Sequence, residues 1–299
     1  MRHVLPILAC SLLLAACGSH QGNPGPSSAA SAPVAATATS SAAATSSPAA
    51  ASTAAAAASA PAASGTAAPG NGVSPGPTPA ELAKAQAIYQ RGLGKWTEGK
   101  QYFAITPPQP KATDTSKVEV TEVFSFGCPF CNEFHKVVDN IAKALPSYAK
   151  MEYLPASFNP LENWPVYQRA FFAAQTLGLA RKSYDAVFNA TWKSGELATY
   201  NLGGRGLKPR SDWPKIGDFA RFYAKNYGVN AKQFIAVANS FSVNLKMKRA
   251  DELIKAYGVA STPTFVVNGM YRFDFASAGG VAQANELAQW LAAKAALNK

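Results

Sequence analysis

The segment from Lys117 to Leu145 restricts the possible folds of this chain more than any other. Residues 118–124 read VEVTEVF, in which β-branched and aromatic side chains dominate, and this composition predicts a β-strand. Apolar side chains then recur at helical spacing from Cys131 until Pro146, which predicts a helix that begins at once. The strand therefore delivers the chain directly to a helix N-terminus.

Cys128 and Cys131 lie at this junction, with Pro129 suited to the first turn of the helix. The partial positive charge and the unpaired N–H groups of a helix start stabilise a thiolate and lower its pKa. Two intervening residues leave the sulfurs close enough for the second thiol to resolve a mixed disulfide formed by the first. We expect Cys128 to be the accessible nucleophile and Cys131 to be its buried resolving partner.

Two other roles for the cysteines fit the sequence less well. A zinc site needs three or four ligands, and once a signal sequence is removed only Cys128, Cys131 and His135 are candidates. A purely structural disulfide that closes so short a loop would constrain the unfolded chain little. We therefore expect redox chemistry and no metal.

The octapeptide FSFGCPFC, residues 124–131, closely resembles the active-site segment of the DsbA thiol:disulfide oxidoreductases. Residues 99–102, GKQY, and 263–269, PTFVVNG, resemble further landmarks of that family. The resemblance covers residues 81–299. It implies an α/β, thioredoxin-like fold with an inserted helical domain.

The expected order of elements agrees with that fold. The thioredoxin parts are expected at about 95–160 and 256–299, and the helical insertion at about 160–255. Asn268-Gly269 predicts a tight hairpin. The expected elements are a helix at 80–91, strands at 102–105, 118–124 and 151–154, the helix that starts at Pro129, the hairpin strands 264–268 and 270–275, and a last helix with Val281, Leu287 and Leu291.

Thr262 and Pro263 take their expected roles from the resemblance. In thioredoxin-like proteins a cis proline at this place faces the cysteine pair. The backbone of Thr262 would then be free to pair with an extended substrate segment, a form of strand addition. An ordinary trans proline that opens a strand is the alternative.

Two positions depart from the family's pattern. Phe130 stands where the best-known oxidases have a histidine that stabilises the thiolate, so we expect a less depressed pKa for Cys128 and a weaker oxidant. Glu122 matches the acidic residue beneath the cysteines, but Tyr153 stands where its lysine partner would align. Glu122 is either a proton relay for Cys131 or a strand residue that faces solvent.

Five phenylalanines near these positions could line an apolar groove for unfolded chains. Because large apolar side chains are often buried, we expect about half of them to be core. They are Phe124, Phe126, Phe130, Phe158 and Phe265.

The first 80 residues differ in composition from the rest of the chain, with Arg2 as their single charged residue and no aromatic side chain. Residues 1–17 have the pattern of an export signal, and Leu14-Ala15-Ala16-Cys17 resembles the lipobox of bacterial lipoproteins, whose cysteine is acylated. An ordinary cleaved signal is the alternative. By the same resemblance, Gly18 rather than Asp after that cysteine implies sorting to the outer membrane. Residues 18–80, rich in Ala, Ser, Pro and Gly, predict a disordered tether.

The formal net charge of +11 arises almost entirely after residue 80. The basic residues are scattered along the sequence, so we interpret the charge as a solvated surface and expect no nucleic-acid partner. No segment resembles a dimerisation domain, and a monomer is expected.

Together these features predict a lipid-anchored periplasmic enzyme that oxidises thiols of unfolded exported proteins. By resemblance, a membrane partner of the DsbB type reoxidises it, and the chemistry needs no bound cofactor. A disulfide isomerase or reductase, and a tethered peptide-binding module without redox turnover, are the alternatives.

Overall fold

The computed structural model describes residues 76–204 and 206–299. The predicted signal, Cys17 and the predicted tether up to residue 75 lie outside this range. Helix α1 (Pro79–Arg91) begins two residues before the predicted domain boundary. Thr78 caps it, because its hydroxyl accepts from the Glu81 amide while the Glu81 carboxylate accepts from the Thr78 amide.

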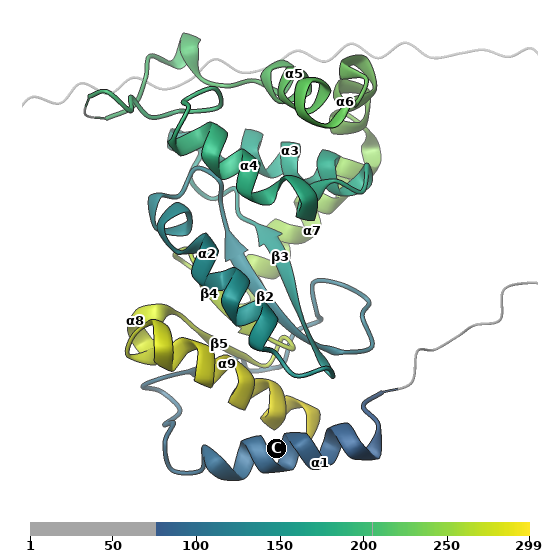
Figure 1. The fold of residues 1–299 in the computed structure, drawn as a ribbon, viewed down its shortest axis with the longest axis vertical. Coiled ribbons are helices and arrows are strands. Elements are labelled where there is room, and N and C mark those ends of the chain that lie inside the picture. The colour runs from purple at the N-terminus through teal and green to yellow at the C-terminus, as the bar shows by residue number, and fades with distance from the viewer. Residues whose placement is uncertain (1–75, 205) are drawn as a thin grey trace, which may run out of the picture. The chain divides into compact units, whose positions relative to one another are not determined.

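A five-stranded sheet forms the centre of the described residues, with the order β1-β5-β4-β2-β3 (Figure 1). Strands β2 and β3 are parallel, and the other neighbours are antiparallel. The bounds are β1 (Phe103–Ala104), β2 (Val118–Phe124), β3 (Ala149–Pro155), β4 (Thr264–Val267) and β5 (Tyr271–Phe273).

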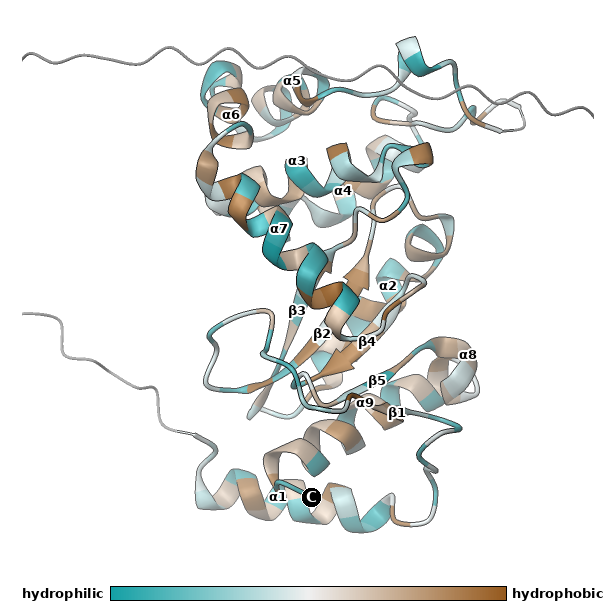
Figure 2. Cartoon of the chain, turned by 180° about the vertical axis from the view of Figure 1, so that it is seen from behind, coloured by the Kyte–Doolittle hydropathy of each residue, from teal (hydrophilic) through white to brown (hydrophobic). Residues whose placement is uncertain are grey.

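Helices cover the sheet on both sides. Figure 1 shows α2 (Pro129–Ala144) in front of the strands, and Figure 2, seen from behind, shows α7 (Phe241–Ala256) nearer the viewer. The chain between β3 and β4 is largely helical, and α8 and α9 follow the hairpin. This is the thioredoxin-like α/β fold with a helical insertion that the resemblance implied. The remaining helices are α3 (Trp164–Thr176), α4 (Ala180–Trp192), α5 (Ile216–Tyr227), α6 (Ala231–Ala238), α8 (Phe275–Ala278) and α9 (Val281–Ala296), with 3₁₀ turns at Pro160–Glu162 and Arg210–Asp212.

All seven residues of β2 are buried, including the polar residues Glu119, Thr121 and Glu122. The strand lies between β3 and β4, and both of its faces are covered. Glu119 is therefore a buried carboxylate. It accepts from the Ala112 and Thr113 amides at 2.7 and 2.9 Å and from the Thr121 hydroxyl at 2.7 Å, which ties the incoming loop to the sheet.

The predicted hairpin at Asn268-Gly269 is confirmed. Both residues have positive φ, 52° and 68°, as a tight turn of this kind requires. A Cβ on Gly269 would lie 2.0 Å from the Gln109 carbonyl oxygen, so a side chain there has no room. Phe275 belongs to α8 rather than to the predicted strand 270–275, because Asp274 caps that short helix.

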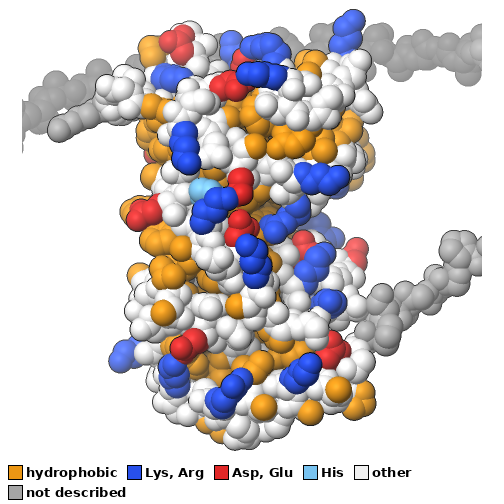
Figure 3. Space-filling view, in the orientation of Figure 1, with side chains coloured by type: hydrophobic (Ala, Val, Ile, Leu, Met, Phe, Trp, Pro, Cys, Tyr) orange, Lys and Arg blue, Asp and Glu red, His pale blue; other side chains and the backbone are white. Residues whose placement is uncertain are grey.

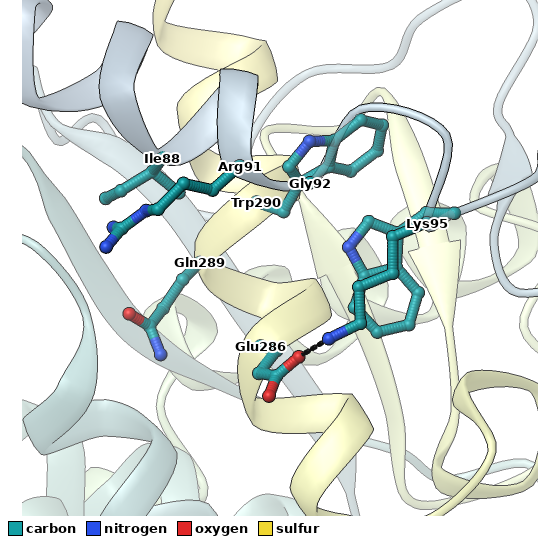
Figure 4. Close-up of a pocket in the computed structure, with 8 residues that line it drawn as sticks. Ile88, Arg91, Gly92, Lys95, Glu286, Gln289 and Trp290 are labelled. Carbon is teal, nitrogen blue, oxygen red and sulfur yellow. Dashed lines mark hydrogen bonds and ion pairs between the residues drawn. The ribbon is translucent and has the colours of Figure 1, made fainter.

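Helix α1 packs on α9 at the end of the fold opposite the helical insertion (Figure 1). Tyr89 stacks on Trp290 with ring centroids 5.5 Å apart. Figure 4 shows the cavity of about 320 Å³ between these helices, with Lys95 paired to Glu286. Neither cysteine lines this cavity.

Candidate active site

Cys128 is the N-cap residue of α2. Its backbone is extended, with φ −86° and ψ 122°, and Pro129 occupies the first turn. The Cys128 Sγ accepts a hydrogen bond from the Cys131 amide at 3.3 Å, so the sulfur fills the position of a capping oxygen. The free N–H groups of the helix start therefore point at the sulfur, as the sequence predicted.

Both cysteines are buried in the reduced state. Cys131 exposes none of its surface, as expected, but Cys128 exposes only 3%. The expectation of an accessible outer sulfur is therefore wrong. Its thiol donates to the Thr262 carbonyl oxygen at 3.4 Å, so the segment before β4 lies directly over it.

The two thiols have different pKa values, because hydrogen bonds act mainly on Cys128 and burial acts mainly on Cys131. Hydrogen bonding with the Cys131 thiol, the Thr262 side chain and the amides of Cys131 and Phe130 lowers the pKa of Cys128 to about 7, against the opposing effect of burial. Burial raises the pKa of Cys131 well above its ordinary value. At neutral pH Cys128 thus holds a large thiolate fraction while Cys131 stays protonated.

The Thr262–Pro263 peptide bond is cis, as the resemblance implied. Pro263 immediately precedes β4, which pairs with β2, the strand that leads to the cysteines. Pairing of β4 with β2 therefore brings residues far apart in the sequence to the two cysteines.

Glu122 is completely buried, so its interpretation as a solvent-facing residue is wrong. Tyr153 on β3 is its register partner, and the Tyr184 hydroxyl donates to its Oε2 at 2.9 Å. The Arg181 guanidinium lies 4.1 Å from the Tyr153 ring centroid. Burial raises the pKa of Glu122 to about 8, which makes it a neutral acid at pH 7.

Tyr184 and Arg181 belong to α4, within the helical insertion. The sequence analysis missed both of them, because neither forms a motif with the cysteines. Only the helical spacing between Arg181 and Tyr184, about one turn, could have suggested that they share a face.

The five phenylalanines divide between the core and the surface. Phe124, Phe126 and Phe265 are buried, whereas Phe130 and Phe158 are 60% and 44% exposed. The exposed pair leaves apolar surface that a partner can contact, with Phe130 between the two cysteines and Phe158 packed on Trp164 beside Gly127.

Residues of the insertion also enclose the glycine before the first cysteine. A Cβ on Gly127 would lie 3.0 Å from the Trp164 ring and 3.1 Å from the Tyr167 ring.

His135 on α2 stacks on Phe188 of α4, with ring centroids 4.8 Å apart, and its Nε2 lies 3.7 Å from an Asp185 carboxylate oxygen. His135 therefore connects α2 to α4.

The comparisons with known proteins agree with this geometry. A family model described as Thioredoxin matches residues 113–278. The chain is 34% identical over 200 residues to the thiol:disulfide interchange protein DsbA of Pseudomonas aeruginosa, a match that covers 67% of this chain and 85% of that protein. It is 35% identical over 193 residues to the protein of that name from Pseudomonas syringae, with 64% and 81% covered.

Solved structures give the same result. The crystal structure of Pseudomonas aeruginosa DsbA matches with a TM-score of 0.57 and 33% identity, over 69% of this chain and 98% of that one. The oxidoreductase DsbA from Xylella fastidiosa matches with a TM-score of 0.57 and 26% identity, over 66% and 96%.

Proposed function

The chain belongs to the DsbA family of thioredoxin-fold thiol:disulfide oxidoreductases, and from this premise we propose that it introduces disulfides into exported proteins. The single observation that carries the proposal is the contrast between the two sulfurs. Cys128 caps a helix with its pKa lowered to about 7, and Cys131 is buried with its pKa raised. Such a pair releases Cys128 readily as a thiolate, which favours transfer of its disulfide to a substrate.

In the proposed reaction, a substrate thiolate attacks Sγ of Cys128 in the oxidised pair. The bond between the two enzyme sulfurs breaks, its electron pair goes to Cys131, and a mixed disulfide joins Cys128 to the substrate. A buried thiolate at Cys131 is costly, so it takes up a proton. Glu122, buried beside the pair with its pKa raised to about 8, is the acid that supplies it.

A second substrate thiolate then attacks the substrate sulfur of the mixed disulfide. Cys128 leaves as a thiolate, the substrate gains a disulfide, and the enzyme pair retains the two electrons. Reoxidation reverses the proton transfer, because Cys131 must lose its proton before it attacks. We propose a membrane partner of the DsbB type as the electron acceptor and no bound cofactor.

Thr262 and Pro263 are proposed to hold the substrate. The Thr262 carbonyl already contacts the Cys128 sulfur, so a segment that pairs with the Thr262 backbone would pass directly beside it. Displacement of that contact would uncover a sulfur that is nearly closed to solvent. Extended, unfolded chains meet this requirement better than folded ones.

The reduction potential of the Cys128/Cys131 pair tests the direction of the reaction. The lowered pKa of Cys128 favours an oxidising pair, whereas Phe130 supplies no charge or hydrogen bond from its side chain to strengthen this effect. We therefore expect a reduction potential between roughly −270 mV, typical of thioredoxin, and roughly −120 mV, typical of a strong oxidant, and nearer the latter. Equilibration with glutathione measures it. A value at or below that of thioredoxin would favour the reductase alternative, and a pair inert toward dithiols would favour a binding module.

We further propose that the protein is periplasmic, monomeric and anchored to the outer membrane through acylated Cys17. No helix among residues 76–204 and 206–299 is long and apolar enough to span a bilayer. The positive side chains are dispersed over the face in Figure 3, which supports a solvated surface that binds no nucleic acid.

Cys17→Ala should move the protein from the membrane fraction to the soluble fraction, as immunoblotting would detect; unchanged membrane retention would exclude this anchor.

A further inference from the structure

A pair of aromatic residues from the helical insertion lies close to the cysteine segment and has no role in the proposed chemistry. Trp192 ends α4, and its indole N–H donates to the carbonyl oxygen of Phe126 at 2.7 Å. The Tyr200 ring stacks on Trp192, with centroids 5.0 Å apart and an interplanar angle of 30°. This hydrogen bond attaches the pair to a residue two positions before Cys128.

A second attachment reaches the same place. The Tyr167 hydroxyl donates to the Leu197 carbonyl oxygen at 2.6 Å and lies 3.0 Å from the Thr199 hydroxyl. The Tyr167 ring also packs against Gly127, beside Cys128. The segment that carries Tyr200 is therefore held against the cysteine segment from two sides.

Trp192 and Tyr200 are more exposed than the core residues around them. Leu197, Ala198 and Thr199 are buried, whereas Trp192 and Tyr200 are each half-buried. Burial, Glu162 and Cys128 all raise the pKa of Tyr200, in that order, so its ring stays neutral at physiological pH. Two half-exposed neutral aromatic rings near the reacting sulfur offer a flat apolar surface.

We propose that Trp192 and Tyr200 form a platform that positions an apolar or aromatic side chain next to the cysteine of an extended substrate. The inference rests on the proposed function and names the substrate preference of that same site. Stacking on such a surface adds affinity beyond the burial of area alone. Phe130 and Phe158, both exposed, add further apolar surface near the cysteine segment, which favours an apolar neighbour there. The two residues are positioning residues and do not touch the reacting atoms.

Two reduced dithiol peptides that differ only in the residue beside the first cysteine, Phe in one and Ser in the other, test the platform. The full chain in its oxidised form is used. Tyr200→Ala should lower kcat/KM for the Phe peptide about tenfold and leave that of the Ser peptide within about twofold. Tyr200→Phe, which keeps the ring, should retain the wild-type preference.

Tyr89→Ala is the matched control, because Tyr89 forms a similar stack on Trp290 at 5.5 Å, in the α1–α9 region. It should change neither peptide's rate. Should Tyr200→Ala fail to fold by circular dichroism, Tyr200→Leu keeps apolar bulk and tests the same loss of stacking.

Equal losses for both peptides, or a shifted Cys128 pKa, would overturn the proposal, since Tyr200 would then act on the cysteine pair itself. An unchanged preference in folded Tyr200→Ala or Tyr200→Leu would overturn it as well. Failure of the wild-type protein to oxidise either peptide contradicts the proposed function instead, and the two failures are therefore distinguishable.

Discussion

Replacing Cys128 with Ser is expected to lower the rate of disulfide formation in a reduced, unfolded test protein by at least about 10³-fold. Cys128 and Cys131 are the only cysteines after residue 17, so no other thiol can take over the exchange. Cys131 alone is completely buried, with a raised pKa, and is a poor nucleophile. The rate is followed by the loss of free thiols in the test protein.

Cys131→Ser is the informative companion variant. It keeps the reactive Cys128 but removes the resolving thiol, so a mixed disulfide with the substrate should accumulate and be visible on a non-reducing gel. Wild-type oxidation by Cys128→Ser would contradict the mechanism. Full function of that variant in cells, without oxidation in vitro, would support the tethered binding module.

Replacing Glu122 with Gln is expected to stabilise the reduced protein at alkaline pH. The pKa of Glu122 is raised from 4.5 to about 8 by burial. Between these values the unfolded chain releases the proton while the folded protein keeps it, so the free energy of unfolding falls as the pH rises. One pH unit corresponds to about 1.4 kcal/mol, which gives an upper limit of about 5 kcal/mol for the window.

Urea denaturation of the reduced wild type and of Glu122→Gln at pH 5 and pH 9 measures the effect. The stability advantage of the variant should grow by a few kcal/mol between the two conditions. Other titrating groups, Cys128 included, are common to both proteins. Glu252→Gln, at an exposed carboxylate on α7, is the matched control and should show no such growth. An advantage independent of pH would mean that Glu122 is ionised in the folded state.

The same Glu122→Gln substitution also bears on the proton step. A Gln cannot deliver a proton to Cys131, so resolution and reoxidation should slow while the pKa of Cys128 stays near 7. A variant that kept the wild-type pH–rate profile would remove Glu122 from the mechanism and leave its burial as a purely structural fact.

The sequence by itself determined the strand, the helix start and the position of Cys128 between them. These features depend on neighbours along the chain: side-chain periodicity, a proline in the first turn and unpaired amides at a helix end. The Asn268-Gly269 hairpin belongs to the same class, because its backbone conformation is set by the two residues themselves.

Only the tertiary structure decided what surrounds the sulfurs. The Thr262 carbonyl covers Cys128, Tyr184 donates to Glu122, and Trp192 reaches the Phe126 carbonyl, each across a long separation in sequence. Burial makes Glu122 a neutral acid, contrary to the alternative of a solvent-facing strand residue, and Cys128 is only 3% exposed although its outer position suggested an accessible sulfur. The physical reason is that desolvation and hydrogen bonding depend on every segment packed around a group, whereas local patterns record only its neighbours in the chain.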